Sequence, residues 1–283
     1  MISYLQAAVL GIIQGVTELF PVSSLGHSVI VPSLLSWNID QNADSFVVFL
    51  VATHFATALV LLGFFWKDWV KIFQGFFRSI IFRKIAGDGY ARLAWLIILA
   101  TIPAGLLGLI FEKKFAALFG APKSAALFLI ANGILLFAAE KMRRKNILPA
   151  EHVSADEKAS KMPWLKSFGV GCAQILALIP GFSRTGAALS GGLFSGLDHE
   201  SAARFAFLLA TPIIFAAALL KLPALFHGGY PRGATLVGAL FAALGAYFSV
   251  RFLTKYFKTK TLTPFAYYSV IAGILSFVIL LVR

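Results

Sequence analysis

The segment Glu18-Leu-Phe-Pro-Val-Ser-Ser-Leu-Gly-His27 breaks the first apolar stretch of the chain, which occupies residues 3–20. A second stretch, residues 164–179, is broken in the same way by Pro180-Gly-Phe-Ser-Arg-Thr-Gly186. Proline ends a helix, whereas glycine and serine permit non-helical backbone. At membrane depth such backbone is tolerated only inside protein or beside a water-filled cavity. We therefore interpret both segments as re-entrant helix–loop–helix elements, whose second arms cover residues 22–38 and 184–198.

Composition indicates an integral membrane protein. Of the 283 residues 59% are hydrophobic and 13% are charged, and the mean hydropathy is +0.84. A soluble domain is about a quarter charged, so this chain cannot cover a water-exposed surface with polar groups. The sequence predicts an all-α polytopic protein with one membrane domain, residues 1–283. Six apolar runs are long enough to cross a bilayer, which takes about 20 residues: 46–66, 93–111, 122–139, 203–226, 233–252 and 262–282.

The net charge of +13 resides mainly in three connections. Residues 67–92, 141–166 and 251–260 contain six, seven and four Lys or Arg residues. The positive-inside rule places these connections in the cytoplasm, which puts both chain termini outside. We expect these basic connections to contact anionic membrane lipids. We expect no binding of nucleic acid, because no basic–aromatic motif stands outside the membrane.

The sequence divides into two halves joined by a cytoplasmic linker at residues 141–163. Residues 1–140 contain the first re-entrant element (3–38) and three spans, and residues 164–283 contain the second (164–198) and three spans. Three is an odd number, so the halves are predicted to be inverted relative to each other. Inverted repeats with interrupted helices commonly hold their site near the middle of the membrane.

A weak internal similarity supports the repeat. Gln14, followed by Pro21-x-x-Ser24, echoes Gln174, followed by Pro180-x-x-Ser183, with a one-residue difference in the Gln–Pro spacing.

Ionisable side chains at membrane depth are costly and usually functional. Gln14 and Glu18 are four residues apart, so they share one face of the first helix. An amide oxygen and a carboxylate are ligands that suit Mg²⁺ or Ca²⁺.

The first loop offers Ser23, Ser24 and His27. A hydroxyl three residues from an imidazole resembles a nucleophile with its base, or a nucleophilic histidine beside a phosphate-binding hydroxyl. A serine-rich helix cap with a hydrogen-bonded histidine is the alternative interpretation. His54, in an otherwise apolar span, is either a group near the site or a structural histidine.

The second loop has the features of an anion site. Arg184 supplies a forked guanidinium, Ser183 and Thr185 supply hydroxyls, and Gly181 and Gly186 expose backbone N–H groups where a helix begins. A phosphate or diphosphate is the expected ligand. The alternative is that Arg184 extends to the membrane interface. If Glu18, His27 and Arg184 meet, one pocket would contain a metal ligand, a candidate nucleophile and a phosphate-binding guanidinium.

At these two loops the chain resembles the undecaprenyl-diphosphatase family, also called bacitracin-resistance proteins. The family's first motif, Glu/Gln-x-x-x-Glu followed by Pro-Val-Ser-Ser-x-Gly-His, reads here from Gln14 to His27. The second motif, Pro-Gly-x-Ser-Arg-Ser/Thr-Gly, reads here from Pro180 to Gly186.

The resemblance implies a divalent-cation-dependent enzyme of the bacterial cytoplasmic (inner) membrane. It would hydrolyse undecaprenyl diphosphate to undecaprenyl phosphate, the lipid carrier used in peptidoglycan and cell-wall synthesis. The matched residues take their roles from the family: Gln14 and Glu18 would bind the metal, Ser183 and Arg184 would hold the diphosphate, and Ser24 and His27 compete as nucleophile or proton donor. Glu18 is also a candidate general base. The alternative function is a transporter or flippase of polyprenyl phosphate lipids, and a homodimer is left open.

Overall fold

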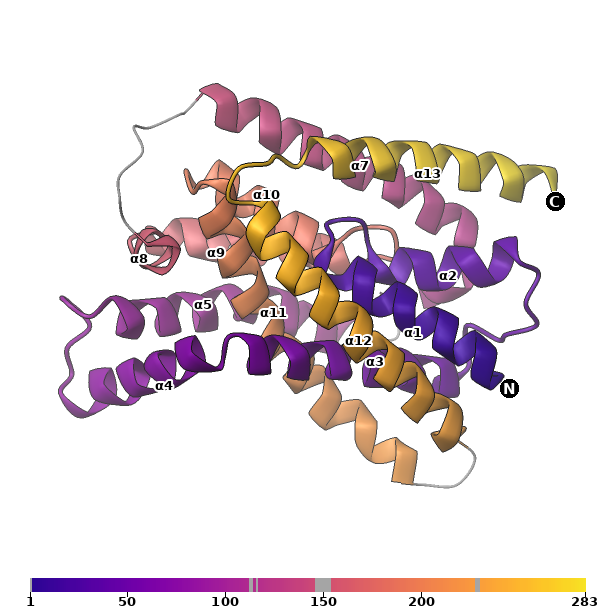
Figure 1. Ribbon diagram of the computed structural model, residues 1–283, viewed down its shortest axis with the longest axis horizontal. Helices are drawn as coiled ribbons and strands as arrows, with labels where there is room; N and C mark the ends of the chain where they lie inside the picture. The colour runs from indigo at the N-terminus through magenta and orange to yellow at the C-terminus, as the bar shows by residue number, and fades with distance from the viewer. Residues whose placement is uncertain (1, 112–113, 116, 146–153, 227–229) are drawn as a thin grey trace.

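The computed structural model describes residues 2–111, 114–115, 117–145, 154–226 and 230–283, in which all regular structure is helical (Figure 1). The first group of helices in chain order is α1 (Tyr4–Leu19), α2 (Ser24–Leu34), α3 (Asp44–Phe64), α4 (Trp66–Ile81), α5 (Gly89–Ile110), the short η1 (Ala117–Gly120) and α7 (Pro122–Lys145). The second group is α8 (Ala155–Ser160), α9 (Trp164–Ala173), η2 (Gln174–Leu178), α10 (Arg184–Phe194), α11 (His199–Lys221), η3 (Leu222–Phe226), α12 (Arg232–Tyr256) and α13 (Thr263–Val282).

Six of these helices are long and apolar enough to cross a membrane, which confirms the six predicted spans. They are α3, α5, α7, α11 with η3, α12 and α13. Their mean hydropathies lie between 1.6 and 2.3, and much of each helix surface remains exposed on the protein. These exposed apolar faces are the surface that lipid would cover.

The sequence interpretation treated the basic connection at residues 67–92 as a loop, but the structure shows that much of it is helical. Most of its first half forms α4, which packs against α5. Gly75 permits this close packing, because a Cβ atom there would lie 2.5 Å from the Ala91 nitrogen. The charges at Lys67, Asp68 and Lys71 hid this amphipathic helix from a search for uniformly apolar runs.

The two predicted helix–loop–helix elements are present as α1 with α2, and as α9 and η2 with α10. Both second arms are shorter than predicted, covering Ser24–Leu34 and Arg184–Phe194. Serines cap both arms, and each serine side chain accepts a hydrogen bond from the backbone N–H three residues later. That each element enters and leaves a membrane on the same side stays a prediction.

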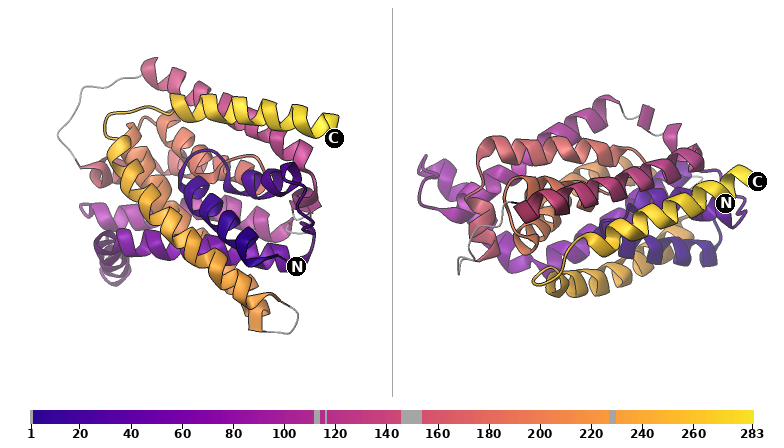
Figure 2. Two further views of the ribbon diagram at one scale, coloured as in Figure 1. Left: turned by 45° about the vertical axis from the view of Figure 1, so that its right-hand side comes forward. Right: turned by 90° about the horizontal axis from the view of Figure 1, so that it is seen from above.

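Packing between the two halves is reciprocal, as a repeat would require (Figure 2). Helix α1 packs against α12 while α9 packs against α5, and α3 packs against α12 while α11 packs against α5. Glycines allow the close approach of α1 to α12 and of α9 to α5. A Cβ atom at Gly15 would collide with the Ala242 carbonyl oxygen, and one at Gly171 would lie 2.5 Å from the Ala100 carbonyl oxygen.

Both chain termini lie at one end of the molecule, and α8 lies at the other (Figure 1). Which side of a membrane the termini occupy stays a prediction. Ion pairs fasten α8 to α11: Lys158 Nζ lies 2.7 Å from Asp198 Oδ2, and Arg204 pairs with Asp156. Part of the predicted linker, residues 146–153, lies outside the described residues.

Candidate active site

Glu18 forms the centre of the site. It lies in the last turn of α1, which ends at Leu19 just before Pro21. The side chain of Glu18 is only 3% exposed. A buried carboxylate is costly unless charges and hydrogen bonds surround it, and the two loops supply both.

Arg184 brings the second loop to Glu18. Its Nη2 atom lies 2.5 Å from Glu18 Oε1, although 166 positions separate the two residues in the chain. Thr185 adds a second link, since its hydroxyl donates to the Glu18 backbone carbonyl at 2.7 Å. The predicted meeting of carboxylate and guanidinium is therefore present in the structure.

Four donor atoms from other residues surround the Glu18 carboxylate. Besides Arg184 on Oε1, Gln14 Nε2 donates to Oε2 at 3.1 Å and the Ser24 hydroxyl donates to Oε2 at 2.5 Å. His54 Nε2 lies 3.1 Å from the same oxygen. The site thus joins residues of α1, α2, α3 and α10 around one carboxylate.

His27 does not join this cluster, which corrects the predicted meeting of Glu18, His27 and Arg184. Its Nδ1 atom contacts the Ser23 carbonyl at 2.6 Å and its Nε2 atom contacts the Tyr268 hydroxyl at 2.8 Å. The reason is the position of α2 between α1 and α13: Ser24 faces α1, while His27 reaches α13. The imidazole beside Glu18 belongs to His54.

The other predicted phosphate ligands mainly hold the two loops together. The Ser23 hydroxyl oxygen accepts from the Gly26 N–H at 3.1 Å and from the Gly181 N–H at 3.2 Å. The Ser183 hydroxyl oxygen accepts from the Gly186 N–H at 3.0 Å. Two of the N–H groups predicted to bind phosphate, those of Gly181 and Gly186, therefore already have partners within the protein.

Asn132, on α7, fastens both loops from a third side. Its amide nitrogen donates to the Pro21 carbonyl at 2.9 Å, and its amide oxygen accepts from the Ser183 N–H at 3.1 Å. The side chain is fully buried. Asn132 is the site residue that the sequence analysis did not single out, and the role of His54 was left open between a group near the site and a structural histidine. A polar residue in an apolar span was the only available signal for each.

A cavity of about 340 Å³ opens beside the cluster. Glu18, Ser24, His54, Ser183 and Arg184 contribute polar groups to its wall. The remaining lining is mostly apolar and comes from α3, α5, η2 and α11, including Val47, Leu50, Val51, Ala104, Gly108, Leu109, Leu178, Ile213, Ile214 and Leu220. Ligand sites commonly have this character, in which a few convergent polar groups lie in an apolar wall.

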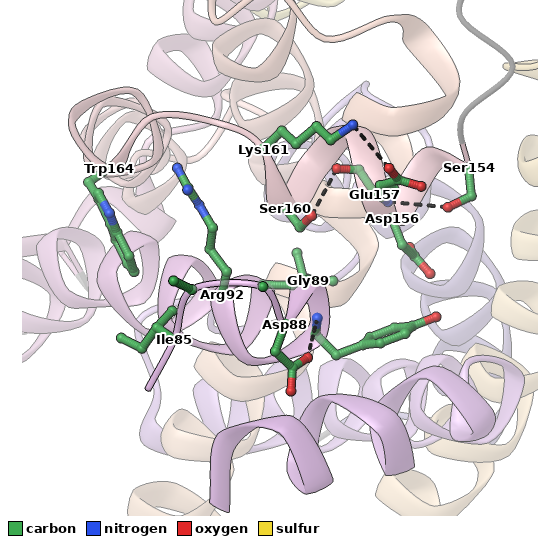
Figure 3. Close-up of a pocket in the computed structure, with 14 residues that line it drawn as sticks. Ile85, Asp88, Gly89, Arg92, Ser154, Asp156, Glu157, Ser160, Lys161 and Trp164 are labelled. Carbon is green, nitrogen blue, oxygen red and sulfur yellow. Dashed lines mark hydrogen bonds and ion pairs between the residues drawn. The ribbon is translucent and has the colours of Figure 1, made fainter. Parts of the chain in front are cut away.

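A larger cavity, of about 700 Å³, lies between α8 and the start of α5 (Figure 3). It shares no lining residue with the site around Glu18. Asp88, Arg92, Glu157, Lys161 and Trp164 are among its lining residues. Its acidic and basic groups are interspersed, and most belong to the turn before α5 and to α8.

The expected divalent cation has two oxygen donors here. One is the Glu18 carboxylate, and the other is Gln14 Oε1, a buried acceptor without a hydrogen-bond partner in the described part of the chain. That same part contains no group of three or more His, Cys, Asp or Glu side chains that could cage an ion. Mg²⁺ often binds through one or two protein oxygens and completes its shell with waters and substrate phosphates. Gln14 and Glu18 would fit that mode with the Gln14 amide, whose nitrogen now faces Glu18, turned so that its oxygen faces the ion.

These features define a class: a polytopic helical membrane protein in which two interrupted helices bring a carboxylate, a hydroxyl and a guanidinium to one apolar cavity. The family model described as bacitracin resistance protein BacA matches residues 7–275. The chain belongs to this family.

Similar proteins agree over nearly the full length. A protein of Mycolicibacterium paratuberculosis named undecaprenyl-diphosphatase is 46% identical, and the match covers 100% of this chain and 99% of that protein. Proteins named undecaprenyl-diphosphatase 2 from Frankia alni and Chromobacterium violaceum are 41% and 42% identical. Those matches cover 97% and 98% of this chain, and 97% and 99% of the respective relatives.

Proposed function

We propose that this protein is an integral membrane phosphatase that hydrolyses undecaprenyl diphosphate to undecaprenyl phosphate and inorganic phosphate. It would thereby recycle the lipid carrier for cell-wall synthesis and counter bacitracin. The family and the names of the full-length relatives support this activity.

One observation carries the proposal: the Ser24–Glu18–Arg184 cluster lies in the wall of a cavity that is otherwise mostly apolar. A polyprenyl diphosphate has a matching division, with a strongly anionic head and a purely hydrocarbon tail. The head would lie against the cluster, and the tail would leave along the apolar wall toward lipid.

Ser24 is the nucleophile in this mechanism. Its oxygen forms a bond to the terminal phosphorus, and the bond from that phosphorus to the bridging oxygen breaks, so undecaprenyl phosphate leaves with the electron pair. The Ser24 proton passes to Glu18 Oε2, to which the hydroxyl already donates. Water then attacks the phosphoserine, and Glu18 returns the proton to the departing serine oxygen. Both water hydrogens leave on the released phosphate.

Arg184 offsets charge on the phosphoryl group. A guanidinium has five N–H donors, so Arg184 can bind Glu18 with one nitrogen and still present others to the diphosphate. Stabilising charge is the main requirement in phosphoryl transfer. A Mg²⁺ or Ca²⁺ ion held by Gln14 and Glu18 would supply further positive charge to the phosphates.

The family and the charge distribution support a proposal for the cellular setting. We place the protein in the bacterial inner membrane, with both termini outside and the basic connections in the cytoplasm. The four groups described around the Glu18 carboxylate belong to the same copy of the chain as Glu18. Whether two copies associate as a homodimer is a separate property.

Phosphate release from undecaprenyl diphosphate by the purified protein in detergent tests the proposal, with and without EDTA. We expect release that EDTA abolishes and added Mg²⁺ or Ca²⁺ restores. Arg184→Ala should release none while eluting as a folded protein. A transporter or flippase predicts no phosphate release by the wild-type protein, and that result would overturn the proposal.

A further inference from the structure

His54 is a buried histidine on α3 that lies outside both loop motifs and contacts both residues of the proposed attack. It is 8% exposed and lines the cavity. Its Nε2 atom lies 3.1 Å from Glu18 Oε2 and 3.4 Å from Ser24 Oγ. Of the three histidines that the structure describes, this is the one whose ring contacts the Glu18 carboxylate.

The other ring nitrogen fixes the orientation of the imidazole. His54 Nδ1 lies 2.7 Å from the backbone carbonyl oxygen of Leu50, one helical turn earlier. A carbonyl oxygen can only accept, so Nδ1 carries a hydrogen and stays bound to the helix backbone. A carboxylate oxygen likewise only accepts, so in the contact with Glu18 Oε2 the Nε2 atom also carries a hydrogen and donates it. This bond turns Nε2 toward Glu18 and Ser24, in the way that a second hydrogen bond orients a ligating histidine.

Other buried polar residues of α3 are satisfied within their own helix. The Thr53 hydroxyl donates to the Leu50 carbonyl at 2.8 Å, and the Thr57 hydroxyl donates to the Thr53 carbonyl at 3.2 Å. Neither threonine lines the cavity wall described above. His54 differs because it links α3 to two other helices at the centre of the site.

We propose that His54 is a positioning residue for the hydrolysis: its Nε2 atom holds the Glu18 carboxylate in place against the Ser24 hydroxyl. This inference rests on the proposed function. Arg184 binds the other carboxylate oxygen. Without His54, Oε2 keeps only its hydrogen bonds from Gln14 and from Ser24 itself, and the carboxylate can turn toward the guanidinium and away from Ser24. A displacement of about 1 Å at a reacting group can cost about 100-fold in rate.

Two substitutions separate the two ring nitrogens. In His54→Gln the side-chain amide nitrogen takes roughly the place of Nε2, whereas in His54→Asn it takes roughly the place of Nδ1. We therefore expect His54→Gln to retain most of kcat. His54→Asn keeps the bond to the Leu50 carbonyl, yet it should lose roughly 10- to 100-fold in kcat with KM nearly unchanged. If Asn retains as much kcat as Gln, or more, the contact with Glu18 has no positioning role and the proposal is wrong.

Thr57→Ala is the matched control, because it also removes a buried polar group from α3 but leaves the site intact. It should keep the kcat of the wild-type protein. All rates are referred to the folded fraction from size-exclusion chromatography, so a loss of folding cannot imitate a loss of positioning. An equal fall in kcat for Thr57→Ala and His54→Asn would assign the effect to α3 as a whole and would overturn the proposal.

The wild-type protein and Ser24→Ala are measured alongside. A wild-type protein that releases no phosphate refutes the proposed function, and the role of His54 falls with it. An active wild type, an inactive Ser24→Ala variant and equal rates for the two His54 variants would refute the role of His54 alone.

Discussion

The two interrupted elements have the same cap geometry but carry different chemistry. Ser23 and Ser183 each cap a second arm, and each lies nine residues after its glutamine, Gln14 or Gln174. The two cap serines are therefore the equivalent pair. The sequence echo, which matched Ser24 with Ser183, was one residue out of register because the second loop has one more residue between its proline and its cap.

This register places unlike residues at matched positions. Glu18 in the first element corresponds to Leu178 in the second, and Ser24 corresponds to Arg184. Ser24 and Arg184 are both the first residue of their arm, and both contact the Glu18 carboxylate, one on each oxygen. The two interrupted elements supply two similar caps, and two residue differences between the elements turn that frame into a chemical site.

The largest expected effect comes from removing the carboxylate of Glu18, which the first element has and the second element lacks. Glu18→Gln should lower kcat/KM by about 10,000-fold, since Ser24 loses its proton acceptor. Leu178→Ala, at the matched position, should lose less than about tenfold, because it removes only apolar contact in the cavity wall. Phosphate-release kinetics compare the two. Equal losses would mean that the difference between the elements has no chemical consequence.

The next effect distinguishes the two candidate nucleophiles within the first element. Ser24→Ala should abolish turnover, whereas His27→Ala should reduce it only about tenfold by loosening the first loop. Tyr268→Phe removes the partner of His27 Nε2 and should resemble His27→Ala. Steady-state kinetics of the three variants suffice. Complete loss in His27→Ala with activity left in Ser24→Ala would reverse the assignment.

A smaller effect, on stability, concerns the residue that joins the elements. Asn132→Ala leaves the Pro21 carbonyl and the Ser183 N–H without their buried partner. The free energy of unfolding should fall by about 2 kcal/mol. Unfolding in detergent, followed by circular dichroism, measures this change. A variant as stable as wild type would show that the loops hold together without α7.

The smallest effect lies far from the loops, where Asp198 caps α11 and pairs with Lys158 of α8. Burial alone would raise the pKa of Asp198, but hydrogen bonds from Lys158 and Ser201 outweigh burial and hold it below its usual value. A lowered pKa stabilises the fold above the unfolded pKa, and this contribution disappears as pH falls through the folded pKa.

Asp198→Asn should therefore lower the midpoint of thermal unfolding by a few degrees at pH 7. The difference from wild type should begin to shrink as the pH falls toward the usual aspartate pKa, about 3.9, and should disappear only below the lowered folded pKa. Thermal scans across this range provide the measurement. A difference that grows toward low pH would contradict the assignment, and turnover at pH 7 should not change.

Sequence reasoning located most of this architecture because its signals are local. Proline after an apolar run fixes where α1 ends, and six runs of bilayer length fix the spans. The pairing of Glu18 with Arg184 was predictable because both are charged residues in interrupted helices, where burial demands a partner. The direction of His27 was not predictable, since it depends on α13 lying beside α2. Asn132 was missed, and the role of His54 was left open, for a similar reason: their partners come from distant parts of the chain.

Identification of the phosphorylated residue tests the central claim most directly. Wild-type protein is mixed with undecaprenyl diphosphate labelled in its terminal phosphate. Parallel samples are quenched within milliseconds in acid and in base, and each is analysed by peptide mass spectrometry under the same acidic or basic conditions. The account predicts an acid-stable phosphate on Ser24 that is absent from Ser24→Ala and from Glu18→Gln. An acid-labile, base-stable phosphate on His27, or turnover of wild type without any phosphorylated enzyme, would contradict it.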